Sequence, residues 1–372
     1  MVTRRDFIAM SAVAAAGPLA AAGCASAGGE EGYDEAVRKT WRHTEGGPAD
    51  GPALARELVR YATLAPWSHN TQCWKFRLDE RSISILPDLA RRCPVVDPDD
   101  HHLFVSLGCA AENLAQAALA NGLQALVTPG AAPTDALRIA LEPTRAVRSA
   151  LFDAIPLRQS TRAEYDGKTL TSEESKLLEQ AGSGAGVRVL LLTEKAAMEK
   201  VLEYVIEGNT AQVNDPAFVE ELKHWIRFGE SEAVRSGDGL LSRSTGNPAL
   251  PRWLGSILFG MFFTPKSENG KIAKQVRSSA GIAVFVSDAD DPAHWMETGR
   301  CYQRFALQAA ALGIRNAHLN QPVEVATLRP QFAGFLGIGQ RRPDLVVRFG
   351  RGPLTPRSLR RPVDDVLVSS SA

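Results

Sequence analysis

Three polar side chains alternate in the stretch PLRQSTRAEYDG, residues 156–167. Arg158, Ser160 and Arg162 lie two positions apart, and Gln159 stands between the first two. In an extended segment alternate residues face the same way, so two guanidiniums and a hydroxyl can converge on one anion. A phosphate group suits this combination, whereas a solvated basic loop is the simpler alternative, and the stretch taken alone favours the loop.

A second basic cluster lies near the C-terminus, in GRGPLTPRSLRRPVDDVL, residues 350–367. Its guanidiniums belong to Arg357, Arg360 and Arg361. An ordinary charged tail would look similar. The prolines and the apolar ending nevertheless predict a segment that docks against the body of the protein.

A polar turn between a helical run and a strand is the third candidate, in ATLAPWSHNTQCWKF, residues 62–76. Ser68, His69, Asn70 and Gln72 offer hydrogen-bond donors and acceptors, and the histidine can exchange a proton near neutral pH. Pro66 ends the preceding helix, because the residue before a proline avoids helical backbone angles. Such a turn can present several polar side chains to one ligand.

Together these stretches resemble the nitroreductase superfamily, specifically its exported, single-chain, Acg-like branch of FMN-binding oxidoreductases. The family pattern R-x-S-x-R/K matches residues 158–162, and the turn A-P-S-x-x-N-x-Q-P-W matches APWSHNTQCW, residues 65–74, with Cys73 in place of the proline. LNQPVE, residues 319–324, resembles the loop near the flavin N5 atom. SLRRPV, residues 358–363, resembles the C-terminal motif that returns to the phosphate. The resemblance covers nearly all of the chain after its first segment.

The resemblance implies that the chain binds FMN. Arg158, Ser160 and Arg360 would hold the phosphate, and Arg162 would lie nearer the pyrimidine edge. His69 could act as a general acid, but no catalytic residue is assigned. The other residues that the resemblance places at the cofactor are Ser68, Asn70, Gln72, Gln159, Gln321, Pro322, Val323, Glu324 and Arg361.

The resemblance also implies an α+β fold, a nitroreductase-like three-layer α–β–α sandwich with a mixed sheet, in which two fused halves form a pseudo-dimer. Residues 52–150 would form the half that carries the polar turn, and residues 151–372 the half that carries the arginine motif. One chain would then hold one FMN and remain a monomer. An insertion at about residues 209–275 would form a lid, with Trp253 and Phe259 near the ring.

Two functions follow from this resemblance. The first is an oxidoreductase with ping-pong hydride transfer, in which NAD(P)H or another donor reduces the flavin and an acceptor such as a nitroaromatic or a quinone follows at the same face. The second is a flavin-binding or sequestering protein, in which the lid covers the flavin and NAD(P)H supports no turnover. Access to the flavin separates the two.

The first 24 residues predict an export signal of the twin-arginine type, because TRRDFIAM precedes a short Ala-rich run. Cys24 follows that run, and simple cleavage and lipid attachment at Cys24 both remain open. Residues 25–51, which are rich in Gly, Ala and acidic residues, predict a linker. The protein is therefore expected in the periplasm or the cell envelope.

Composition excludes some partners. Lys plus Arg total 42 and Asp plus Glu total 42, so no excess of positive charge favours nucleic acid, and a small-molecule substrate is expected instead. Cys73, Cys93, Cys109 and Cys301 form no C-x-x-C pair, which argues against a metal site and leaves a disulfide open. The acids of DPDDHH, residues 97–102, are expected to cap a helix rather than bind a metal, and GSGAG, residues 182–186, to form a plain loop.

Apolar periodicity and turn residues predict the elements that must position these side chains. In the first half we expect a helix before Pro66, a hairpin in 72–88, a long helix in 97–122 and strands in 123–130 and 135–143. In the second half we expect helices in 172–182, 194–213, 215–229 and 292–313 and strands in 186–193, 280–288 and 343–350. The two long helices end alike, at Asn121-Gly122-Leu123 and Leu312-Gly313-Ile314, which indicates a weak internal repeat.

Overall fold

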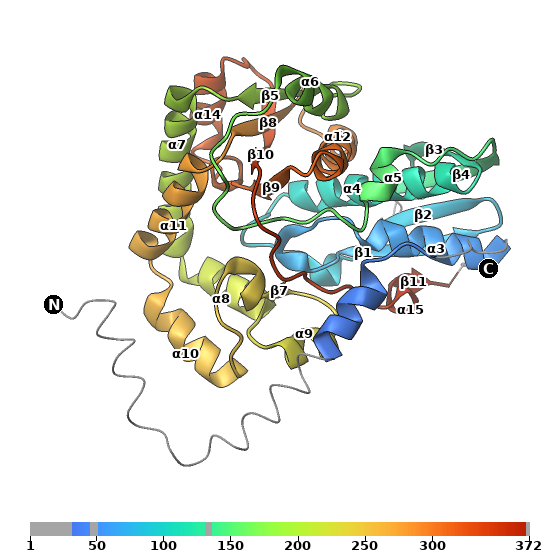
Figure 1. Cartoon of the computed structure of the whole chain (residues 1–372), viewed down its shortest axis with the longest axis horizontal. Coiled ribbons are helices and arrows are strands. Elements are labelled where there is room, and N and C mark those ends of the chain that lie inside the picture. The colour runs from blue at the N-terminus through green and yellow to red at the C-terminus, as the bar shows by residue number, and fades with distance from the viewer. Residues whose placement is uncertain (1–31, 45–50, 131–135, 370–372) are drawn as a thin grey trace, which may run out of the picture.

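The computed structural model describes residues 32–44, 51–130 and 136–369 (Figure 1). The predicted export signal and Cys24 lie outside these residues. A helix at residues 32–40 comes first. The first half continues with α3 (Gly51–Thr63), η1 (Ser68–Asn70), β1 (Trp74–Asp79), β2 (Ser82–Pro87), η2 (Leu89–Arg91), α4 (His101–Ala120), β3 (Leu123–Pro129), β4 (Leu137–Pro143) and α5 (Ala150–Ala154).

The second half is longer because many helices lie between its first two long strands. It contains α6 (Ser172–Ala181), β5 (Val187–Leu192), α7 (Lys195–Val213), α8 (Pro216–Trp225), β6 (Ile226–Arg227), α9 (Glu230–Ser236), β7 (Leu240–Leu241), η3 (Ser242–Thr245), α10 (Arg252–Phe262) and α11 (Pro265–Arg277). It ends with β8 (Gly281–Ser287), α12 (Pro292–Ala311), β9 (Arg315–His318), α13 (Gln321–Glu324), α14 (Arg329–Leu336), β10 (Arg342–Gly350), α15 (Val363–Val366) and β11 (Leu367–Val368). The long helices and strands expected from periodicity are all present.

The two halves build sheets of the same topology. The first sheet has the order β11-β1-β2-β4-β3 and the second has the order β5-β8-β10-β9, so β1, β2, β4 and β3 correspond to β5, β8, β10 and β9. Within both series each neighbouring pair is antiparallel. The C-terminal strand β11 joins the first sheet parallel to β1, which makes that sheet mixed. The expected α+β fold with a mixed sheet is therefore present.

Two buried helices, α4 and α12, cross at the centre of the molecule. A Cβ atom on Gly108 of α4 would overlap the carbonyl oxygen of Met296, and a Cβ atom on Gly299 of α12 would overlap the carbonyl oxygen of Val105. The contact is reciprocal, because each glycine meets the residue three positions before the other glycine. The register of this contact matches that of the repeat seen in the sequence, so the repeat describes a real structural correspondence.

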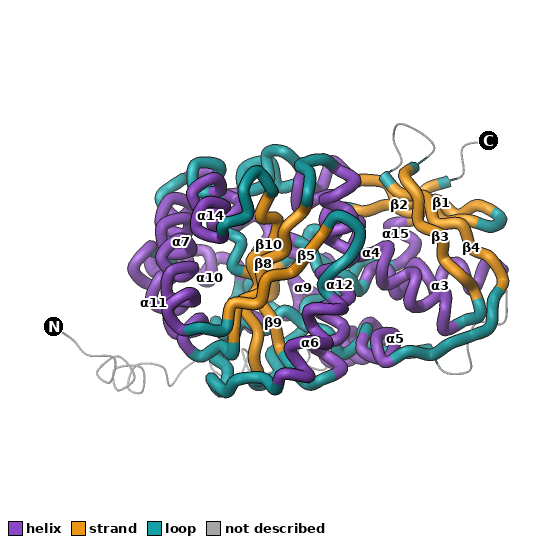
Figure 2. The backbone as a smooth tube through the Cα atoms, turned by 90° about the horizontal axis from the view of Figure 1, so that it is seen from above, coloured by secondary structure: helices purple, strands orange, loops and turns teal. Residues whose placement is uncertain are grey.

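Helices cover the two sheets unequally. In Figure 2 the second sheet lies between α12 with α6 on one side and α7, α11 and α14 on the other, which gives the expected three layers. The residues of β8 and β10 are accordingly buried throughout. β3 of the first sheet instead alternates between half-buried and exposed residues, because helices pack on only one face there. The α4 helix meets the length and hydropathy of a membrane span, but most of it is buried in the core between the halves.

The linker predicted for residues 25–51 is wrong for residues 32–40, which form a helix. Tyr33 is buried, and its hydroxyl donates a hydrogen bond to the carbonyl of Arg357 at 2.6 Å. The indole of Trp41 donates to the carbonyl of Ser358 at 3.0 Å. Tyr33, Val37 and Trp41 recur every fourth residue, so a helical apolar stripe was visible in the sequence. It docks the N-terminal segment against the C-terminal segment.

Candidate functional site

Two adjoining hollows contain most of the side chains predicted to bind a ligand. A large cavity of about 800 Å³ is lined by residues of both halves, and a small one of about 60 Å³ adjoins it. Pro66, Trp67, Arg162 and Leu240 line both hollows. The predicted residues in these linings are Ser68, His69, Asn70, Arg158, Gln159, Ser160, Arg162, Gln321, Glu324 and Arg360.

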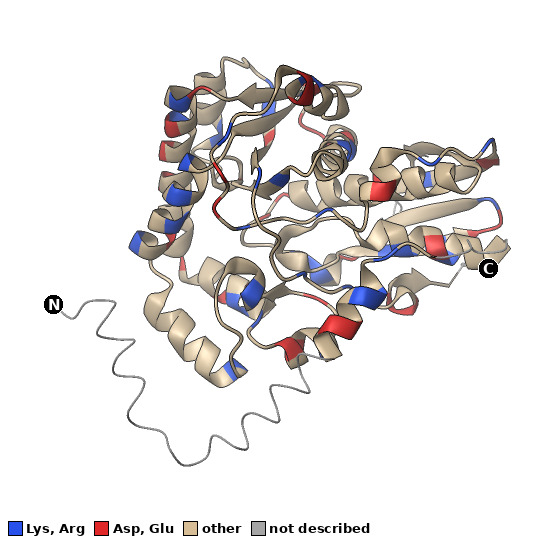
Figure 3. Ribbon diagram, viewed as in Figure 1, with Lys and Arg blue, Asp and Glu red and all other residues tan. Residues whose placement is uncertain are grey.

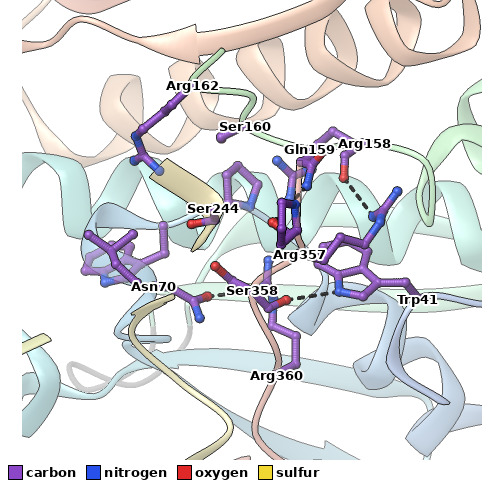
Figure 4. A pocket seen from close by; sticks show the side chains of 14 residues that line it. Trp41, Asn70, Arg158, Gln159, Ser160, Arg162, Ser244, Arg357, Ser358 and Arg360 are labelled. Carbon is purple, nitrogen blue, oxygen red and sulfur yellow. Dashed lines mark hydrogen bonds between the residues drawn. The ribbon is translucent and has the colours of Figure 1, made fainter. Parts of the chain in front are cut away.

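Three guanidiniums surround Trp41 in the small hollow. Figure 4 shows Arg158, Arg357 and Arg360 around the indole, and their guanidinium carbons lie 6.0, 4.7 and 4.8 Å from its ring centre. Within the described residues none of the three forms an ion pair with a carboxylate. Burial, and then the charge of Arg158, lowers the pKa of Arg357 to about 10. A cluster of buried cations without an acidic partner is costly unless an anion joins it.

Arg158 is the member of this cluster in which two donor atoms lack hydrogen-bond partners in the described part of the chain. Only 3% of its surface is exposed, and its Nη2 donates to the carbonyl of Leu64 at 3.0 Å. Its Nε and Nη1 atoms are buried and have no partner. Burial lowers the pKa of this guanidinium, but arginine stays protonated at neutral pH. Arg158 therefore has two donors free for an anionic ligand.

All three guanidinium nitrogens of Arg360 donate hydrogen bonds within the protein. It donates to the carbonyls of Thr63 at 2.6 Å and Ala65 at 3.0 Å, at the C-terminal end of α3. It also donates to the side-chain oxygen of Asn70 at 2.9 Å. A cation at this place satisfies carbonyls that the helix leaves without a partner. Arg360 thus contributes charge to the hollow, while its hydrogen bonds hold α3 and the turn.

The amides of the polar turn bind backbone rather than ligand. Asn70 donates to the carbonyls of Gly239 at 2.9 Å and Leu359 at 3.1 Å. Gln72 lies outside the lining of both hollows, where it donates to the carbonyl of Gly237 at 2.8 Å and accepts from the N–H of Arg361 at 2.9 Å. The prediction that Gln72 contacts a cofactor is therefore wrong.

Other predicted ligands also have structural roles. The Gln159 side chain donates to the carbonyl of Thr355 at 2.5 Å and accepts from the Thr355 N–H at 3.2 Å. Arg361 lies outside both linings and donates to the carbonyl of Asp365 at 2.7 Å. Pro322 and Val323 are buried away from the hollows, and Val323 packs in the core beside the second sheet. These side chains hold the segments of the site together.

Ser68 and His69 are the turn residues that line the large cavity. Among the described residues four other than glycine have positive φ, and His69, Asn70 and Gln72 are three of them. Such backbone is uncommon and persists only where surrounding contacts enforce it. The hydrogen bonds of Asn70 and Gln72 supply those contacts, so the two amides fix the position at which His69 faces the cavity.

Another wall of the cavity comes from the end of β9 and the segment that follows it. His318, Gln321 and Glu324 line it. Burial, assisted by the charge of His102, lowers the pKa of His318 to about 3, and burial with the charge of Arg162 lowers that of His69 to about 4. Burial raises the pKa of Glu324, whose carboxylate accepts from Gln212 at 2.7 Å. Both histidines are therefore neutral at pH 7.

The third wall is largely apolar and comes from the insertion between β5 and β8. Gly255, Leu258 and Phe259 of α10 line it together with residues of α8 such as Phe218. Trp253 points away from the cavity, because it is absent from the lining and 68% exposed. Phe259 therefore lies at the cavity, where the expected lid needs it, whereas Trp253 does not.

Two groups of potential metal ligands occur in the described residues. Asp97, His101 and His102 form one, but Asp97 accepts the N–H groups of His102 and Leu103, as a helix-capping acid does. His101 hydrogen bonds to Asp344 at 2.9 Å. His69, Cys93 and Glu221 form the other group, and both oxygens of Glu221 accept backbone N–H groups. Capping and hydrogen bonding thus engage Asp97 and one ring nitrogen of His101, while the other nitrogen, Nδ1, is buried without a partner among the residues that the structure describes.

Several lining residues were not predicted from the sequence. Trp41 was assigned to the linker, and Ser244 lies in a segment with no recognisable pattern. Ser358 begins the SLRRPV stretch, but no role at the site was predicted for it. Tyr302 lines the large cavity from α12. The aromatic stripe in residues 32–41 offered a signal for Trp41, but it indicated packing rather than a site.

Comparisons with known proteins show which sequences and structures this chain is similar to. No protein-family model matches the chain. "Putative NAD(P)H nitroreductase Rv3131" of Mycobacterium tuberculosis is 26% identical over 326 residues, which cover 84% of this chain and 90% of that protein. "Putative NAD(P)H nitroreductase acg" of the same organism is 21% identical over 328 residues, covering 84% of this chain and 95% of that protein.

Solved structures are more distant. The FMN-dependent nitroreductase NfnB from Mycobacterium smegmatis in complex with NADPH has a TM-score of 0.41 and 14% identity, covering 60% of this chain and 98% of that chain. A nitroreductase with bound FMN from Desulfitobacterium hafniense has a TM-score of 0.37 and 13% identity, covering 60% of this chain and all of that chain. Both mycobacterial relatives align over 84% of this chain, so along most of its length the chain is similar to proteins named as putative nitroreductases.

Proposed function

We propose that this protein is an FMN-dependent oxidoreductase of the nitroreductase type. The observation that carries the proposal is Arg158, a buried guanidinium with two unpaired donors, placed where a small cationic hollow adjoins a cavity of about 800 Å³. A ligand that fits must have an anionic end and a long, partly apolar body. FMN has both, and the names of the mycobacterial relatives support the choice.

The residues present fit this cofactor. Arg158 would hold the phosphate together with Ser160, while Arg357 would add charge. The carbonyl of Arg162 accepts from the Gln275 side chain at 2.8 Å, but the Arg162 guanidinium has no hydrogen bond or ion pair among the described residues and lines both hollows, so its charge is available at the ring. Ser68 and His69 would approach from the first half, and Gln321 and Glu324 from the second. Bound FMN would supply hydride transfer between a donor such as NAD(P)H and an acceptor such as a nitroaromatic or quinone.

We further propose that the two halves stand in for the two subunits of a dimer. Their matching strand orders and the reciprocal glycine contact of α4 and α12 support this. The protein would then be a monomer with one FMN. The export signal at residues 1–24 and an envelope location belong to the same proposal, and they rest on the sequence pattern alone.

Absorbance spectroscopy of the purified protein tests the function. We expect flavin bands as purified or after incubation with FMN, and bleaching of these bands by NADPH without oxygen. Bands that bleach with dithionite but not with NADPH would favour a covered flavin and the sequestering function. Absence of flavin even after incubation would contradict the assignment of Arg158.

A further inference from the structure

The helix α10 has two apolar faces and only one of them is buried. Its inner face lines the cavity with Gly255, Leu258 and Phe259. Its outer face exposes Trp253, Ile257 and Met261, at 68%, 54% and 63% of their surfaces. These three residues recur every fourth position, so they form one continuous stripe. Contiguous exposed apolar surface of this kind marks a site of interaction.

Charged residues are absent from this helix beyond its first position. Residues 253–265 contain no Asp, Glu, Lys or Arg, and Figure 3 shows α10 as a tan helix with a single blue residue at its start. That residue, Arg252, pairs with Glu232 at 2.5 Å. Lys266, just beyond the helix, is exposed and has no ion-pair partner among the described residues. A protein-binding face normally has polar residues around its apolar centre. A helix that binds a lipid surface needs only an apolar face that can insert and cations beside it.

We propose that the outer face of α10 docks onto the surface of a lipid bilayer. The helix spans residues 252–262, too few to cross a membrane, so it would lie in the interface with Trp253, Ile257 and Met261 inserted. Tryptophan favours this depth because its ring is apolar and its N–H remains near the headgroups. Phe262, which lines the cavity and is also exposed, places the rim of the cavity beside the bilayer.

The N-terminal chain favours a bilayer over another occupant. Lipid attachment at Cys24 would leave eight residue steps to Gly32, which reach at most about 29 Å when fully extended. In Figure 1 the helix at residues 32–40 and α10 lie along the same lower edge of the molecule. An anchor there would bring α10 to the membrane. The cavity behind it would then take apolar ligands dissolved in the lipid. The docking itself does not depend on the proposed redox function.

Vesicle flotation tests the docking without the anchor. The signal-processed chain carrying Cys24→Ser is mixed with vesicles of phosphatidylethanolamine and phosphatidylglycerol. We expect flotation with the vesicles and quenching of Trp253 by nitroxide-labelled lipid. The double variant Ile257→Lys/Met261→Lys should lower the bound fraction by about tenfold or more, because lysines resist insertion. The matched control is Leu126→Lys, since Leu126 is 42% exposed on β3 at the opposite side of the molecule, and it should float unchanged.

Three outcomes would overturn the proposal. The first is that the protein carrying Cys24→Ser alone fails to float. The second is that the double lysine variant floats as well as that protein does. The third is a dimer in light scattering that the double variant abolishes, which would identify a second copy as the occupant. Flavin absorbance and thermal unfolding of each variant are measured in parallel. If a variant loses flotation while its flavin absorbance and its thermal unfolding are unchanged, the loss reflects docking and not misfolding or loss of FMN.

Discussion

The two halves of the molecule contain corresponding turns that differ in what they carry. In the first half, residues 64–73 connect α3 to β1, and they contain Ser68, His69, Asn70 and Gln72. In the second half, residues 182–186 connect α6 to β5, with the sequence GSGAG. The second turn closes tightly through backbone pairing of Gly184 with Val187. The turn at this topological position therefore presents polar side chains in the first half, whereas in the second half it only reverses the direction of the chain.

The segments that precede these turns differ in the opposite way. Before α6, residues 158–162 supply Arg158, Ser160 and Arg162. Before α3, the corresponding segment supplies Trp41, which lies against Arg158 with the ring centre 6.0 Å away. Each half thus contributes a different part to a single site. If the two halves stand in for two subunits, as proposed, one chain needs to keep only one copy of each part.

Replacing Arg158 should have the largest effect on this site. We expect Arg158→Met to weaken FMN binding by at least about 100-fold, because a buried phosphate would lose its main partner. The same change should raise the unfolding temperature of the FMN-free protein, since it removes an unpaired buried charge. Fluorescence titration with FMN and thermal unfolding measure the two effects.

The control for this change is Arg148→Met. Arg148 is exposed and pairs with Asp153 at 2.6 Å, so its loss should change neither quantity appreciably. Unchanged FMN affinity in Arg158→Met would contradict the site.

The glycines of α4 and α12 allow a direct comparison of the halves. Gly108→Ala and Gly299→Ala should each lower the free energy of unfolding by roughly 2–4 kcal/mol, because the added methyl meets backbone that cannot move aside. Chemical denaturation measures the loss.

Gly270→Ala in α11 and Gly334→Ala in α14 are matched controls, because nothing lies within 4 Å of their added methyl groups. They should raise the free energy of unfolding by about 0.5–1 kcal/mol. If Gly108→Ala and Gly299→Ala lower the free energy of unfolding by very different amounts, the two helices are not equivalent at their crossing.

The polar turn separates structural from ligand-facing residues. Gln72→Ala should lower the free energy of unfolding by about 1–3 kcal/mol, since it leaves the Gly237 carbonyl and the Arg361 N–H without partners. FMN affinity should change little. Ser68→Ala should do the reverse, reducing affinity while leaving stability nearly unchanged. Equal effects of both substitutions on FMN affinity would show that this distinction is wrong.

Acid sensitivity should give the smallest effect. The folded pKa values of His318 and His69, about 3 and about 4, lie below the ordinary value of 6.5. The unfolded chain therefore binds more protons as the pH falls below 6.5, so stability is lost in the direction of acid. Between pH 7 and pH 6 each histidine should contribute a loss of less than about 1 kcal/mol. Urea denaturation of the parent protein and of His318→Leu at both pH values measures the contribution of His318, which should vanish in the variant.

Local sequence determined the elements well and the binding geometry only in part. The periodic apolar positions of residues 101–120 and 292–311 predicted two long helices, and both are present. The alternation of Arg158, Ser160 and Arg162 taken alone favoured a solvated loop, and the family resemblance placed them at an anion; all three residues line the small hollow. The helix at residues 32–40 was missed because a Gly-rich and acidic context obscured its aromatic stripe.

Tertiary structure alone decided which polar residues remain free to bind. Asn70, Gln72, Gln159 and Arg360 have the same chemistry as the residues proposed to bind the ligand, yet partners far away in the chain use their hydrogen bonds. A residue's type and spacing are local properties, so the sequence determined the possible donors. Whether a buried donor has a hydrogen-bond acceptor depends on which groups the folded chain places beside it. Only the folded chain could therefore leave Arg158 unpaired beside Trp41, at the edge of the cavity.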